Sequence, residues 1–181
     1  MITLFKNGSR TKGIFRRNFI WLLLVGLTSI CNATPHILIV NADFKGDWNF
    51  NEQKSKIAEG RRMNAQKIKV SQEGDATLIE RTLASQNGDN IVSSEKLTFD
   101  GKTAESTVFG TSKRKSTATW SADGQSMTIN SIIAFERDGN TTEIKIVETW
   151  KLTDDGKSLS IDYTTTSPRG TTTNTLVYDK A

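Results

Sequence analysis

Hydrophobic and polar residues alternate with a period of two along most of the chain after residue 66. Ile68 and Val70, for example, alternate with lysine and serine, and Leu159, Ile161 and Tyr163 alternate with small polar residues. This pattern is typical of β-strands with one buried and one solvated face. It predicts ten strands, at 45–51, 66–72, 76–84, 91–99, 103–109, 112–120, 125–136, 142–152, 158–166 and 171–179.

Glycine-containing turn signals separate most of these segments, among them Asp100-Gly101, Asp123-Gly124 and Asp155-Gly156. Asp-Gly pairs supply the positive φ angles that tight hairpins require, so consecutive strands are expected to pair antiparallel. The segment 52–65 is charged and lacks β-branched runs, which leaves it as a helical turn or a loop.

We therefore predict an all-β fold, an antiparallel up-and-down meander of about ten strands. Such a meander must hide its apolar face, and the sequence has no long amphipathic helix to cover it. Closure into a barrel is the first expectation because it also removes exposed sheet edges. A β-sandwich is the alternative.

The N-terminal segment predicts export. Five basic residues and no acid precede the apolar stretch 19–30, which is followed by Cys31-Asn32-Ala33. A secretory signal peptide consists of a basic region, a short apolar region and small residues before the cleavage site. We therefore predict a signal peptide at residues 1–33, with cleavage between Ala33 and Thr34. A lipoprotein anchored through Cys31 and an uncleaved anchor are the alternatives. Residues 34–43 are predicted to be flexible, and 44–181 to form a single β-barrel domain in the periplasm or outside the cell (bacterial envelope).

Removing the signal changes what the charge implies. The whole chain has a net charge of +4, but without five basic residues 19 Lys and Arg face 20 Asp and Glu. The remaining domain is near neutral, which gives no indication of nucleic-acid binding. The single cysteine of the chain, Cys31, is removed with the signal peptide. Neither a disulfide nor a cysteine metal site is therefore expected in the remaining domain, and no cofactor is predicted.

The residues Gly46-Asp47-Trp48 resemble the opening strand of lipocalins and fatty-acid-binding proteins. This resemblance implies a calycin-type barrel in which Gly46 and Trp48 plug one end. Ten strands with a short insert after the first are closer to the fatty-acid-binding layout than to the eight-stranded lipocalin one. The stretch Trp48-Asn-Phe-Asn51-Glu-Gln-Lys54-Ser55 is also similar to the opening of small exported bacterial proteins of unknown function.

Catalytic candidates are few. The single histidine, His36, is expected in a solvated tail, so a histidine metal cluster and Ser-His chemistry are not expected. A pair of carboxylates at a barrel mouth remains open in principle, but most acidic residues fall in turns. We predict that the protein is not an enzyme and holds no metal.

The binding candidates are polar residues on inward faces. Strand parity places Arg114 on the same face of its strand as Trp120, and Glu148 on the same face as Trp150, which is the apolar face in each strand. Buried lone charges are costly, so each needs a partner, water or a ligand. One hypothesis is that they face a cavity and bind a ligand together with four aromatic residues, Trp120, Phe135, Trp150 and Tyr163. The alternative places both charges at a barrel rim or on a bulge that turns them outward.

The predicted function is an exported, non-enzymatic β-barrel that binds a small, partly apolar ligand in its interior. The alternative is an envelope structural or protein-interaction module with a filled core and no ligand. A small lipophilic molecule is the expected partner. No nucleic acid is expected, and membrane contact is expected only through the signal segment before cleavage.

Overall fold

The computed structural model describes residues 40–58, 64–84, 89–137 and 139–181, and in them ten strands form one antiparallel sheet. Strands that are consecutive in the chain pair with each other, except β4 and β5, and β1 additionally pairs with β10. The predicted meander is confirmed, with boundaries shifted by at most two residues. The strands are β1 (Gly46–Phe50), β2 (Lys67–Glu73), β3 (Ala76–Ala84), β4 (Asn90–Leu97), β5 (Ala104–Val108), β6 (Ser112–Trp120), β7 (Ser126–Arg137), β8 (Asn140–Thr153), β9 (Ser158–Ser167) and β10 (Gly170–Lys180).

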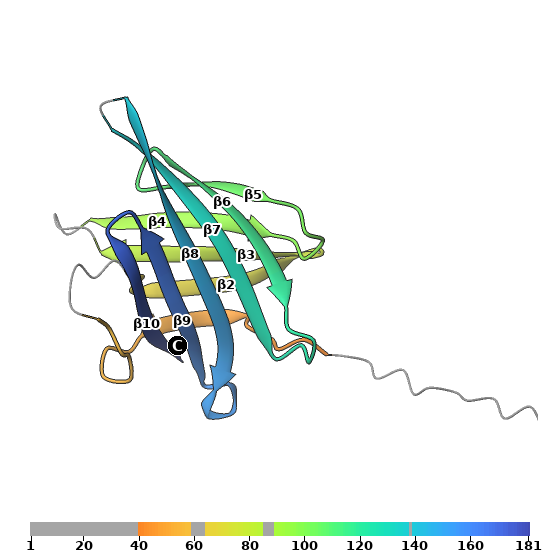
Figure 1. Ribbon diagram of the computed structural model, residues 1–181. Coiled ribbons are helices and arrows are strands. Elements are labelled where there is room, and N and C mark those ends of the chain that lie inside the picture. The colour runs from red at the N-terminus through yellow and green to blue at the C-terminus, as the bar shows by residue number, and fades with distance from the viewer. Residues whose placement is uncertain (1–39, 59–63, 85–88, 138) are drawn as a thin grey trace, which may run out of the picture. The chain divides into compact units, whose positions relative to one another are not determined.

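The sheet curls into a nearly closed barrel, as predicted, and does not form a sandwich (Figure 1). Its edge strands, β4 and β5, lie against each other. Every other pair of adjacent strands is joined by a ladder of backbone hydrogen bonds, but β4 and β5 are not. This seam is therefore the place where side chains, rather than backbone hydrogen bonds, must hold the barrel together.

The predicted Asp-Gly turns connect the strands. Gly101 and Gly124 have φ angles of 79° and 70°, a region that L side chains rarely adopt. Between β8 and β9 the chain makes a short 3-10 turn, η1 (Asp154–Gly156). Because the ladders run without a bulge through β6, β7, β8 and β9, strand parity decides which side chains face inward.

The barrel has two different ends. At the tryptophan end, where β6 meets β7 and β8 meets η1, a buried cluster that includes Trp48, Met127, Trp150 and Leu159 fills the interior. At the cavity end, where β5 meets β6 and β9 meets β10, a smaller cluster of Val108, Ile133 and Ile146 leaves space inside. The apolar core is thus solid at one end only.

Trp48 lies within the filled end, 1% exposed, and its indole Nε1 donates a hydrogen bond to the Phe44 carbonyl at 2.9 Å. The Lys180 ammonium lies 5.5 Å from the centre of the Trp48 ring. The Lys180 side chain also passes close to Gly46, where an added Cβ would lie 3.2 Å from the Lys180 Cε. The φ angle of Gly46 is 135°. Glycine at position 46 allows this close approach.

The described residues directly after β1, 51–58, turn at 52–54 and then run beside β10, and they form no helix. The Ser55 hydroxyl donates to the Asn51 carbonyl at 2.6 Å and accepts from the Val177 amide at 2.9 Å. Lys56 forms a backbone bridge with Thr175. Asn51, Lys54 and Ser55, which follow β1, therefore make contacts that secure this segment.

Several predictions lie outside the described residues. The signal peptide 1–33, the cleavage site at Ala33 and Thr34, and His36 all belong to this group. Of the segment 34–43, residues 40–43 are described, and there the Ala42 amide donates to the Gly124 carbonyl at 2.8 Å. Within the described part of the chain, no helix has the length and hydrophobicity that crossing a membrane demands.

Candidate ligand-binding site

A cavity of about 390 Å³ lies inside the barrel, toward its cavity end. This volume falls within the range of about 300 to 1,000 Å³ that is usual for small-molecule sites. Inward-facing side chains of strands from both sides of the seam line it, because the alternation of β2 to β10 directs every second residue to the interior. The apolar lining consists of Ile57, Ala58, Ala65, Ile68, Leu83, Ile91, Val108, Phe109, Ile133, Phe135, Ile144, Ile146, Ile161 and Leu176.

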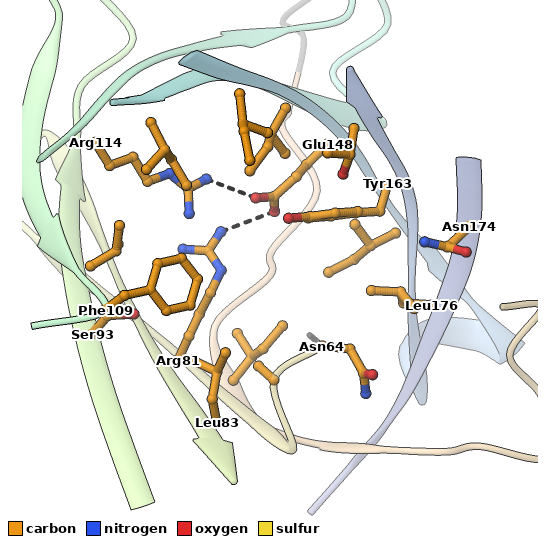
Figure 2. A pocket seen from close by; sticks show the side chains of 18 of the residues that line it. Asn64, Arg81, Leu83, Ser93, Phe109, Arg114, Glu148, Tyr163, Asn174 and Leu176 are labelled. Atoms are coloured by element: carbon orange, nitrogen blue, oxygen red, sulfur yellow. Dashed lines mark hydrogen bonds and ion pairs between the residues drawn. The ribbon is translucent and has the colours of Figure 1, made fainter. Parts of the chain in front are cut away.

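Three charged side chains form one wall of this apolar space (Figure 2). Glu148 of β8 lies between two arginines from different parts of the barrel. Its Oε2 accepts a hydrogen bond from Arg81 Nη2 at 3.0 Å, and its Oε1 accepts one from Arg114 Nη2 at 2.8 Å. Arg114 and Glu148 are 6% and 2% exposed, so both charges lie in the interior.

Further polar side chains complete what we call the interior ion cluster, namely Arg81, Glu95, Arg114, Ser116, Ser131 and Glu148. Glu95 of β4 accepts a hydrogen bond from Arg81 through one oxygen and from the Ser116 hydroxyl, at 2.9 Å, through the other. Ser131 accepts from Arg114 Nε at 3.0 Å and from Nη2 at 2.8 Å. The cluster joins β3 and β4 to β6, β7 and β8, and therefore spans the seam of the barrel.

Trp150 supports the cluster from the filled side. Its Nε1 donates to Glu148 Oε2 at 2.9 Å, and the Arg81 guanidinium lies 5.7 Å from the centre of its ring. Trp150 is two residues from Glu148 in the same strand, so both side chains face the interior. The indole thus fixes the carboxylate and covers the arginine on the side away from the cavity.

The electrostatics follow from these contacts. Burial by itself would raise the pKa of Glu148, but the guanidinium groups of Arg81 and Arg114 and its hydrogen bonds lower the pKa to about 2. The two carboxylates in turn raise the pKa of Arg81 despite its burial. Burial, together with the Glu148 charge, raises the pKa of Tyr163, whose hydroxyl points toward that carboxylate in Figure 2.

The two carboxylates of the cluster are poorly suited to general-base chemistry. Each carboxylate of the cluster already accepts hydrogen bonds through both oxygens. A Glu148 carboxylate with a pKa near 2 is a weak general base at neutral pH. Among the described residues, no group of three or more His, Cys, Asp or Glu side chains is placed to hold a metal ion.

Four of the six residues predicted to bind a ligand line the cavity together: Arg114, Phe135, Glu148 and Tyr163. The alternative of a rim position or an outward bulge for Arg114 and Glu148 is wrong, because both are buried on unbroken ladders. Whether the four contact a ligand stays a prediction.

The placement of Trp120 and Trp150 at the cavity needs correction. Both face inward, but they lie at the filled end, where Phe44 stacks on Trp120 at 5.6 Å and meets Trp150 edge to face at 6.0 Å. Strand parity predicts the face of a residue and says nothing of its depth along the barrel. Phe44, which precedes the first strand, packs against both rings within the buried cluster of that end, and neither tryptophan lines the cavity.

Three residues of the site were not predicted, namely Arg81, Glu95 and Asn64. The same parity argument applies to the first two, since Arg81 alternates in phase with Ile79 and Leu83, and Glu95 with Leu97. Asn64 lies in the segment between β1 and β2, where no periodic pattern marks a face. Its Nδ2 is buried at the cavity and has no hydrogen-bond partner among the described residues.

Comparisons with known proteins add little to this geometry. No protein-family model matches the chain, and no curated protein matches it. A solved structure of zebrafish ileal bile acid-binding protein, complexed with cholic acid, is similar at 18% sequence identity and a TM-score of 0.47. The match covers 76% of this chain and 98% of the zebrafish chain. This likeness does not identify a ligand for the present chain.

Proposed function

We propose that this chain is an exported, non-enzymatic β-barrel that binds a small, partly apolar molecule in its interior. The observation that carries the proposal is the cavity of about 390 Å³, with an apolar lining and a polar wall of Arg81, Arg114 and Glu148. Such a combination of many apolar and few converging polar side chains is typical of small-molecule sites.

The energetics favour a ligand with a substantial apolar surface. Transfer of apolar surface from water contributes about 25 cal/mol per Å². The cavity is built on strands, and the cluster and Trp150 hold its charged wall in place, so little ordering is required when a ligand enters. The filled-core alternative, an envelope structural or interaction module, fits less well because the core is solid only at the tryptophan end.

Two neighbouring isoleucines of β7 provide a matched test. Ile133 lines the cavity and is 4% exposed, whereas Ile132 points to the outer face and is 40% exposed. Ile133→Trp should fill the cavity, and Ile132→Trp should leave it unchanged. The measurement is fluorescence titration with N-phenyl-1-naphthylamine, an uncharged apolar probe, with circular dichroism to confirm folding.

We expect saturable probe binding by the native chain and by the Ile132 variant, and a loss of at least about tenfold in affinity for the Ile133 variant. Equal binding by both variants would place the probe outside the cavity. A folded native chain with no saturable binding, and with no small-molecule adduct in native mass spectrometry, would favour the interaction module.

Export rests on the N-terminal sequence, since residues 1–33 lie outside the described part of the structure. We expect expression of the full chain in a bacterium to give a periplasmic or secreted product that begins at Thr34. Intact-mass measurement and N-terminal sequencing test this point. A product that keeps residues 1–33, or that carries a lipid on Cys31, would contradict cleavage after Ala33.

A further inference from the structure

The charges at the cavity are balanced. Among the described residues that line it, Arg81, Arg114 and Glu148 are charged, and Glu95, directly behind the two arginines, is the second carboxylate of the cluster. The remaining titratable lining groups, Tyr163 and Tyr178, have pKa values raised by burial and are neutral. The interior ion cluster, which includes Glu95, therefore has a formal net charge of zero, with two arginines and two carboxylates.

Neither arginine is free to receive an anion. Arg81 pairs with both Glu95 and Glu148, and Arg114 pairs with Glu148 at 2.8 Å and with Glu95 at 3.4 Å. A ligand carboxylate near these guanidinium groups would also lie near Glu148, and in a buried site like charges repel strongly. An anion would thus lose its hydration without gaining an arginine whose charge is not already paired with a carboxylate.

The same balance disfavours a cation. Each oxygen of Glu148 accepts a hydrogen bond from one arginine, and Oε2 also accepts one from Trp150. A ligand ammonium group would have to displace an arginine or approach it within the apolar interior. Each alternative leaves one buried charge without a partner, which is costly.

The hydrogen-bonding groups that remain suit a neutral polar atom. The Asn64 Nδ2 is a buried donor at the cavity without a partner among the described residues, and Ser93 and Thr165 add hydroxyl groups to the lining. A hydroxyl, carbonyl or amide oxygen of a ligand can accept from Asn64 without bringing charge.

On the basis of the proposed function, we infer that the cavity selects uncharged ligands, an apolar body with a neutral hydrogen-bonding head group. Three competitors with one tail and different head groups test this: 1-decanol, decanoate and decylamine. Near pH 8 the carboxylate is ionised and the amine is protonated. Each is used to displace N-phenyl-1-naphthylamine from the native chain, below its micellar concentration.

The neutral alcohol should displace the probe at a concentration roughly tenfold lower than either ion. Equal or tighter binding of decanoate or decylamine would overturn the inference and leave the proposed function intact. If the probe itself shows no saturable binding, the proposed function fails, and the selectivity fails with it.

Two variants test the physical cause. Glu95→Gln and Glu148→Gln each leave an arginine without its full countercharge, so decanoate should gain about tenfold relative to 1-decanol in whichever variant is folded. Glu105→Gln is the matched control, because Glu105 lies on the outer face of β5 and pairs with Lys115 at 3.3 Å. An unchanged order of the head groups in the cluster variants would overturn the inference.

Discussion

Arg81 and Glu148 form an ion pair of 3.0 Å inside the barrel, although 67 positions separate them in the sequence. One lies on β3 and the other on β8, on opposite sides of the seam between β4 and β5. Glu95 extends the connection from β4 to Ser116 of β6 at 2.9 Å. The interior ion cluster therefore closes the barrel through side chains at the place where no backbone ladder does so.

This closure predicts a large effect of Glu148→Ala on stability. The substitution leaves two buried arginines with half of their countercharge, and breaking a buried ion pair costs about 3 to 5 kcal/mol. Urea denaturation followed by tryptophan fluorescence measures the loss. Glu143→Ala, on the exposed outer face of the same strand, is the control and should change the free energy of unfolding by less than about 0.5 kcal/mol. Comparable losses in the two variants would contradict a closing role of the cluster.

The lowered pKa of Glu148 predicts a stability loss in acid. The folded-state pKa of about 2 lies below the ordinary value of 4.5, so the contribution is fully present above pH 4.5 and is lost as the pH falls toward 2. A shift of this size corresponds to roughly 3 kcal/mol. Urea unfolding at several pH values, in the native chain and in Glu148→Gln, isolates this residue from the other carboxylates. Parallel pH profiles in the two proteins would show that Glu148 is not the group responsible.

Gly46 should tolerate substitution less well than a turn glycine. Gly46→Ala introduces a Cβ at 3.2 Å from the Lys180 Cε and places an alanine at a φ of 135°, so we expect a loss of about 2 kcal/mol. Gly74→Ala is the matched control, since Gly74 has a φ of 60° with open space around it and should lose about 1 kcal/mol. Thermal unfolding compares the two. An equal loss would mean that the approach of Lys180 carries no cost.

Ser55→Ala should release the segment after β1 from β10. The change removes a hydroxyl that donates to Asn51 and accepts from the Val177 amide, and a lost hydrogen bond of this kind costs about 1 kcal/mol. Hydrogen exchange of the Val177 amide should become faster. Ser94→Ala, on the exposed face of β4, serves as the control. Unchanged protection of Val177 in the Ser55 variant would contradict this role.

The alternation of single strands was sufficient to predict most of the local structure. Arg114 and Glu148 were expected on the inner face from the hydrophobic neighbours at i±2, and the Asp-Gly turns marked where the meander reverses. Arg81 and Glu95 follow the same parity, and that pattern could have found them. A strand exposes its two faces with a strict period, so this information is local and can be read from the sequence.

What the alternation could not predict is depth and partnership. Trp120 and Phe135 both face inward, yet Trp120 packs on Phe44 in the filled end, while Phe135 lines the cavity. The pairing of Arg81 with Glu148 depends on how the curled sheet brings β3 opposite β8. The sequence by itself determined the strands, their turns and their inner faces, because these depend on near neighbours. Only the tertiary structure decided which inward residues meet and where space remains. Both depend on closure of the barrel, which brings together residues that lie far apart in the sequence.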